Sequence, residues 1–167
     1  MGTMKMGKLI YTVMCLFLFA SVVNCYGAKG KAEEFFEQGK KFSTAENADK
    51  AIDNYSKAIK INPKFVKAYN NRGIAHILKK QYDLAVADLT KAIELDPKNG
   101  KAYNNRAIVY SYLGATGKAL QDLHKAKSLG IAVNPDFLKK MEELPPTPEP
   151  IFHKPAPTPS PAPAPKR

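Results

Sequence analysis

The sequence predicts an all-α fold: a solenoid of three helix-turn-helix repeats, closed by a short capping helix and followed by a disordered, proline-rich tail. The first observation is a hexapeptide, Lys-Ala-Tyr-Asn-Asn-Arg, which occupies residues 67–72 and recurs 34 residues later at residues 101–106. A fixed period of this length is typical of repeat proteins. The second observation is that apolar residues recur at helical spacing, as in Ile74, Ile77 and Leu78.

The hexapeptides divide the body of the chain into units at residues 32–65, 66–99 and 100–133. Each unit contains alanines where two helices must approach closely, at positions Ala51, Ala85, Ala119, Ala58, Ala92 and Ala126. Pro63 and Pro97 end the second helix of their units, because proline lacks the amide that a helix needs. We therefore expect first helices over 33–46, 66–79 and 100–113, and second helices over 48–61, 82–95 and 116–129.

The C-terminal part divides into a capping unit over residues 134–143, with its helix over 135–143, and a tail over residues 144–167. Asn134 followed by Pro135 and an acid is a typical helix start. Ten of the 13 prolines lie between residues 145 and 165, which predicts an extended, disordered spacer. One alternative is a ligand for an aromatic groove on a partner. Ile151 and Phe152 are its only large apolar residues, and another alternative is that they dock on the protein's own solenoid.

The N-terminal 27 residues predict export from the cytoplasm. Lys5 and Lys8 precede an almost wholly apolar run of 15 residues, Leu9 to Val23. This run is shorter than the roughly 20 residues of a membrane-spanning helix, so a cleaved signal peptide is favoured. The protein would then be periplasmic, secreted or membrane-anchored outside the cytoplasm. Two alternatives are an uncleaved anchor and lipidation of Cys25, although Asn24 departs from the small residue usual before a lipidated cysteine.

The pattern of small residues, aromatic residues and terminal prolines resembles the tetratricopeptide repeat, a 34-residue helix-turn-helix unit. Departures are few. Ala107 and Ile131 replace the glycine and proline of the earlier units. The fourth position holds Phe or Tyr in place of Trp, and the seventh holds Gln38, Arg72 and Arg106 in place of Leu.

The resemblance implies that the first helices line a concave groove, and that certain positions of each unit project into it. The candidate peptide-binding residues are Lys67, Asn70, Asn71, Ile74, Lys101, Asn104, Asn105 and Ile108. An asparagine amide donates and accepts hydrogen bonds at once, which matches a peptide backbone. Lysines could pair with acidic groups of the ligand. The alternative is that these polar residues are merely solvated. The first unit has Glu33 and Phe36 instead, so the site is confined to the other two units.

A carboxylate clamp, the device with which some members of this family hold the acidic C-terminal tails of chaperones, matches weakly. Asn71 and Lys101 agree with its pattern. Phe36, Lys40 and Asn105 do not, because the clamp has lysine, asparagine and arginine at these three positions. Two matches in five positions disfavour this ligand type.

Composition narrows the function classes. No cysteine follows Cys25, and the three histidines lie far apart, so we expect no metal site and no cofactor. The sequence contains no nucleophile or acid–base motif typical of an enzyme, so we do not expect catalytic activity. Aromatic residues are not interleaved with basic ones, so we expect no binding of nucleic acid. The leading hypothesis is a non-enzymatic adaptor or scaffold that binds an extended peptide of a protein partner. The net charge of +11 keeps one alternative, a binder of anionic membranes or polymers tethered by its N-terminal segment.

Overall fold

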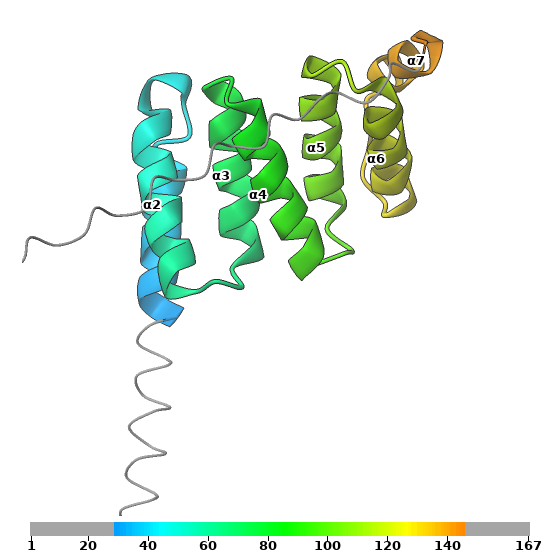
Figure 1. Ribbon diagram of the computed structural model, residues 1–167. Coiled ribbons are helices and arrows are strands. Elements are labelled where there is room, and N and C mark those ends of the chain that lie inside the picture. The colour runs from blue at the N-terminus through cyan, green and yellow to red at the C-terminus, as the bar shows by residue number, and fades with distance from the viewer. Residues whose placement is uncertain (1–28, 146–167) are drawn as a thin grey trace, which may run out of the picture.

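The computed structural model describes residues 29–145, which form helices joined by turns, with no strand in that range. A first helix over residues 29–41 is followed by further helical elements. These are η1 (Ala45–Asn47), α2 (Ala48–Ile61), α3 (Val66–Leu78), α4 (Tyr82–Leu95), α5 (Gly100–Tyr112), α6 (Thr116–Ser128) and α7 (Pro135–Glu143). Figure 1 shows the helices standing in a row from the first pair to α7. The all-α solenoid with a terminal cap is confirmed. The predicted signal segment, Cys25 and the tail beyond Pro145 lie outside the described residues.

The helix ends follow the predicted signals closely. Helices α2, α4 and α7 have the predicted bounds, and α3, α5 and α6 each end one residue early. Asn62 and Asp96 adopt extended conformations at the ends of α2 and α4, because each precedes a proline that disfavours the helical region. Within residues 29–145, no helix combines the length and the apolar character needed to cross a bilayer.

The first helix differs from the prediction of 33–46, because it ends at residue 41 and the chain then turns. The Ser43 hydroxyl donates to the carbonyl of Lys40 at 2.7 Å, a local bond that competes with helix continuation. The equivalent position of the second unit is Ile77, an apolar residue that packs against the core cluster beside it. The turn passes through extended Thr44 into the short helix η1.

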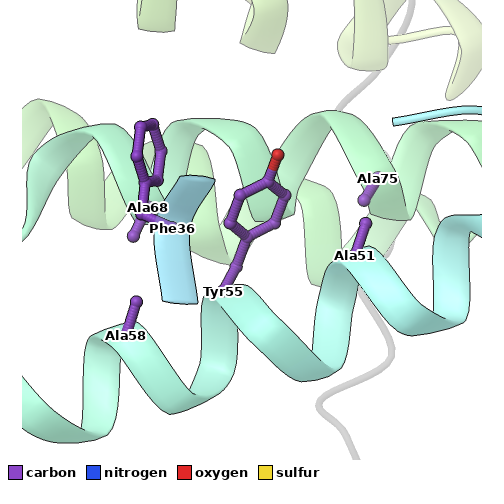
Figure 2. Packing of buried hydrophobic residues seen from close by; sticks show 6 residues of the cluster. All are labelled: Phe36, Ala51, Tyr55, Ala58, Ala68 and Ala75. Carbon is purple, nitrogen blue, oxygen red and sulfur yellow. The ribbon is translucent and has the colours of Figure 1, made fainter. Parts of the chain in front are cut away.

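In each unit, the core contains two buried alanines where helices meet and one large buried residue between them in the sequence. All six of the repeated alanines are fully buried, namely Ala51, Ala58, Ala85, Ala92, Ala119 and Ala126. Tyr55, Leu89 and Leu123 fill the equivalent position of successive units and are also fully buried. Figure 2 shows Tyr55 reaching from α2 toward α3, with Phe36 beside it. A Cβ atom on Gly39 would lie 2.5 Å from the Tyr55 ring, so the glycine makes room for it.

Arginines at the seventh position of the second and third units join neighbouring repeats. Arg72 on α3 donates twice to the Asp88 carboxylate on α4, each at 2.7 Å, and once to the Ser56 hydroxyl on α2 at 2.9 Å. Arg106 makes the same set one unit later, to Asp122 and to the Thr90 hydroxyl. In the family pattern the seventh position is usually leucine, so the pattern alone gives no role for these arginines.

The ion pairs raise the pKa values of both guanidinium groups. The hydrogen bond to Asp88 raises the pKa of Arg72 and outweighs the opposing effect of burial. Burial lowers the pKa of Arg106, but the hydrogen bond and charge of Asp122 together raise it overall. Each carboxylate is nearly buried, with side-chain exposures of 9% for Asp88 and 6% for Asp122. A bidentate partner is what makes such burial tolerable.

Helix α7 closes the apolar end of the third unit. The Asn134 side chain accepts hydrogen bonds from the backbone N–H groups of Asp136 and Phe137, at 2.9 and 3.1 Å. Pro135 stands in the first turn, where its missing N–H costs nothing. Met141 is buried in a cluster with Ala107, Tyr110 and Leu123. The predicted capping helix therefore covers the core of the last repeat.

Candidate peptide-binding groove

The eight candidate residues lie on the first helices of the second and third units. Lys67, Asn70, Asn71 and Ile74 belong to α3, and Lys101, Asn104, Asn105 and Ile108 belong to α5. Three hollows along these helices have candidate residues in their linings. A central pocket of 570 Å³ lies at the starts of α3 and α5, an N-terminal pocket of 260 Å³ lies beside α2 and α3, and a C-terminal pocket of 620 Å³ lies between α5 and α7.

The pockets bring most of the candidates together. Lys67, Asn70, Asn71 and Lys101 line the central pocket. Asn71 also lines the N-terminal pocket, together with Ile74. Asn104 and Ile108 line the C-terminal pocket. Residues from two successive repeats therefore share one surface, and the shared Asn71 makes the first two pockets adjoin.

The asparagines form a connected chain of amides. Asn105 Nδ2 donates to Asn70 Oδ1 at 3.1 Å across the two helices, and Asn70 Nδ2 donates to Asn71 Oδ1 at 3.2 Å. Tyr55 on α2 lines the N-terminal pocket together with Asn71. Burial raises the pKa of the Tyr55 hydroxyl, and the neighbouring Asn71 side chain partly offsets that rise. Each amide has two donors and an oxygen with two lone pairs, so hydrogen-bonding capacity remains for a ligand.

The central pocket is positively charged. Lys67, Lys98 and Lys101 line it and are exposed, and Asp96 is the one acidic residue among its lining residues. Across residues 29–145, no carboxylate lies within ion-pair distance of these three lysines. An acidic group on a ligand would therefore meet ammonium groups that have not been neutralised already.

Apolar side chains are exposed in the two outer pockets. Ile74 and Leu78 are 37% and 41% exposed and line the N-terminal pocket. Tyr112 and Leu144 are 60% and 43% exposed and line the C-terminal pocket. The Tyr112 ring stacks on Tyr82, with ring centroids 5.2 Å apart. The surface thus offers lysines at its centre and apolar contacts beyond them.

The residues that depart from the carboxylate-clamp pattern have other roles. Phe36 is only 5% exposed and packs on Tyr55 and Phe65, with ring centroids 5.7 and 5.0 Å apart. Lys40 pairs with Glu37 at 2.9 Å. Asn105 is bonded to Asn70 rather than supplying a charge. A second lysine at the place of Phe36 would have to replace part of the core.

The histidine in the second unit has a structural environment. His76 is buried, and its Nδ1 lies 2.7 Å from Gln81 Oε1. Its Nε2 lies 3.7 Å from the Asp88 carboxylate. In the part of the chain that the structure describes, no three His, Cys, Asp or Glu side chains are grouped so that they could hold a metal ion.

Stacked helical hairpins with hollows along their first helices define a repeat-type scaffold, and comparison with known proteins identifies its family. Profiles described as "Tetratricopeptide repeat" match residues 66–99 and 89–121, and one described as "TPR repeat" matches residues 45–79. No curated protein sequence matches the chain.

Solved structures agree with these profiles. The TPR2B domain of yeast Sti1, in a complex with pHsp70, is 30% identical, with 66% of this chain and 92% of that chain covered and a TM-score of 0.60. The Arabidopsis OM64 TPR domain is 29% identical, with 69% of this chain and 93% of that chain covered and a TM-score of 0.61. The first TPR of Spaghetti (RPAP3), bound to the HSP90 peptide SRMEEVD, is 26% identical. The match covers 68% of this chain and 92% of that chain, with a TM-score of 0.66. The chain belongs to the tetratricopeptide repeat family.

Proposed function

We propose that this protein is a non-enzymatic interaction module that binds an extended peptide segment of a protein partner along α3 and α5. The observation that carries the proposal is the convergence of Lys67, Asn70, Asn71 and Lys101 from two repeats on one pocket. Two of the similar structures are complexes, one with the HSP90 peptide SRMEEVD and one with pHsp70. They support peptide binding by this fold.

The chemistry of the groove favours an internal acidic segment over a chain terminus. Amides can pair with successive peptide groups without reading side chains. Lys67, Lys98 and Lys101 present point charges for acidic side chains along the segment. Phe36 and Asn105 put no positive charge where a clamp for a C-terminal carboxylate would need it. The ligand is therefore a segment with acidic residues flanked by apolar ones.

We place this module outside the cytoplasm, as part of an exported or envelope-associated protein. The proposal depends on the basic residues and the apolar run of residues 9–23. Sequencing the N-terminus of the mature protein tests it, because a signal peptide predicts a new terminus near residue 26 or 28. Metabolic labelling with a fatty acid, lost on Cys25→Ser, would instead show a lipid anchor. An unprocessed, unlabelled N-terminus in the cytosolic fraction contradicts export.

Peptide selection tests the binding function and does not require an identified partner. A phage-displayed library of random peptides is panned on the full chain, and a selected peptide is measured by fluorescence anisotropy. The Asn71→Ala/Asn105→Ala variant should lose at least tenfold in affinity while its helical circular dichroism stays unchanged. Gln121→Ala is the matched control, because Gln121 is an exposed amide on α6. Equal affinities for all three proteins would refute the groove as the binding site.

Binding of anionic surfaces is the second candidate function, favoured by the net charge of +11. The probe is a vesicle containing phosphatidylserine. Binding through many lysines releases counterions or is screened, so it falls steeply with salt. A groove contact built on amides and apolar side chains falls much less. Vesicle binding that is unaffected by the two asparagine substitutions, together with failure of peptide selection, would favour this second function.

A further inference from the structure

The C-terminal pocket, between α5 and α7, has exposed apolar side chains in its lining. Ile108 and Tyr112 of α5 face Phe137 and Met141 of α7 across it, and Leu144 lies at its edge. Tyr112 and Leu144 are among the most exposed large apolar residues of the described chain. Exposed apolar surface of this kind commonly marks a place where another segment binds.

The chain continues from the rim of this pocket. Helix α7 ends at Glu143, and Leu144, which lines the pocket, has an extended backbone. Residues 146–167 follow, and Ile151 and Phe152 are their only large apolar residues. A candidate occupant therefore begins a few residues from the pocket it would fill.

The connecting residues are long enough for Ile151 to turn back into the pocket. Six residues separate Leu144 from Ile151, and four of them are prolines. At ~3.1 Å per residue, such a segment spans about 20 Å. This span is the upper limit of the reach, and because Leu144 itself lines the pocket, docking needs less than that. Because prolines already restrict the backbone, ordering this segment costs less entropy than ordering a flexible linker.

Charge also favours this occupant. Lys140 lines the pocket and is exposed, and among residues 29–145 no carboxylate lies within ion-pair distance of it. Glu149 stands two residues before Ile151. A positive charge thus lies in the pocket lining, and a negative charge lies next to the apolar pair in the sequence.

We infer that Ile151 and Phe152 dock in the C-terminal pocket as a tethered ligand of the protein's own solenoid. Tethering gives the segment an effective concentration of roughly millimolar, so a weak contact is enough to keep the pocket occupied. Asn104 and Ile108 line the same pocket. If the proposed peptide binding also holds, the docked tail competes with a peptide that extends past α5, and a partner must displace it.

Photo-crosslinking in the full chain tests the docking without an external peptide. Phe152 is replaced by the photoreactive analogue p-benzoyl-phenylalanine, the protein is irradiated at low concentration, and crosslinked fragments are identified by mass spectrometry. We expect intramolecular crosslinks to fragments that contain Tyr112 or Met141. Tyr112→Ser should lower their yield at least fivefold. Leu84→Ser is the matched control, because Leu84 is 49% exposed and lines none of the three pockets.

Several outcomes would overturn the inference. These are crosslinks that join two copies and rise with protein concentration, crosslinks only to other proteins, crosslinks spread along the solenoid, and a yield that Tyr112→Ser leaves unchanged. Leu144→Ser provides a second pocket variant if circular dichroism shows that Tyr112→Ser unfolds the protein. The Asn71→Ala/Asn105→Ala variant should keep the crosslink, since neither residue lines this pocket. Loss of peptide binding and loss of docking are thereby measured separately.

Discussion

Arg72 and Arg106 are single residues that decide how neighbouring repeats are joined. Each reaches one aspartate in its own unit and one hydroxyl in the preceding unit, and both partners are 16 residues away in sequence. The signal is present in the sequence, because Ser56/Thr90, Arg72/Arg106 and Asp88/Asp122 all recur at the repeat period. The family pattern hides it, because arginine at this position stands out only as an exception.

Replacing Arg72 by methionine should be strongly destabilising. The substitution removes the bidentate partner of the nearly buried Asp88 carboxylate and leaves it only the more distant His76 Nε2, at 3.7 Å; breaking a buried pair on one side costs about 3–5 kcal/mol. Urea denaturation followed by circular dichroism measures the change in the free energy of unfolding. The double variant Arg72→Met/Asp88→Leu should recover most of the loss, because no buried charge remains. Equal destabilisation by the single and double variants would show that the ion pair is not the cause.

Two glycines should respond in opposite directions to alanine. At Gly39 the added Cβ would lie 2.5 Å from the fully buried Tyr55 ring, so Gly39→Ala should cost about 1–3 kcal/mol by overpacking. At Gly117, in α6, no heavy atom lies within 4 Å of the added Cβ, so Gly117→Ala should stabilise by about 0.5–1 kcal/mol. Thermal unfolding of the two variants measures both. Stabilisation by Gly39→Ala would contradict the packing described for the first repeat.

Helices were the most predictable elements because their end signals are local. Prolines fix where α2 and α4 stop, and the Asn134 cap fixes where α7 starts. The first helix was predicted from the repeat register alone, and the register carries no information about Ser43, whose hydroxyl bonds the Lys40 carbonyl as the helix ends. Unit 1 therefore departs from the other two at the point where its sequence departs from theirs.

The capping helix should depend on its N-cap side chain. Asn134 satisfies two backbone N–H groups of α7, and replacing such a cap by alanine costs ~1 kcal/mol. We expect Asn134→Ala to lower stability by about that amount and Asn134→Asp to retain it, since aspartate accepts the same bonds. Hydrogen exchange of residues 135–143 measures the effect locally. Unchanged exchange in Asn134→Ala would show that packing of Met141 alone fixes the helix.

The candidate site could be predicted only in part. Repeat positions placed the eight residues on the first helices of two successive units, and the structure puts them on α3 and α5. The hydrogen bond from Asn105 to Asn70 was not predictable, because it depends on how two helices from successive repeats are placed in space. The pocket between α5 and α7 was likewise invisible, since a capping helix carries no repeat signature.

For the whole molecule, the groove predicts which kind of acidic peptide binds more tightly. The central pocket lacks the second lysine of a carboxylate clamp, because Phe36 is buried in the core at that place. We therefore expect the peptide SRMEEVD to bind at least tenfold more weakly than a library-selected peptide with internal acidic residues, measured by calorimetry at physiological salt. Comparable affinities would show that Lys67 and Lys101 suffice to hold a C-terminal carboxylate.

Hydrogen–deuterium exchange of the full chain, with and without a library-selected peptide, tests most directly where a ligand binds. We expect slower exchange in fragments that cover residues 66–78 and 100–112, because α3 and α5 carry the eight candidate residues. We expect no change in fragments over residues 82–95 and 116–128, in α4 and α6. Protection confined to α4 and α6, or spread evenly over all helices, would contradict binding in the groove.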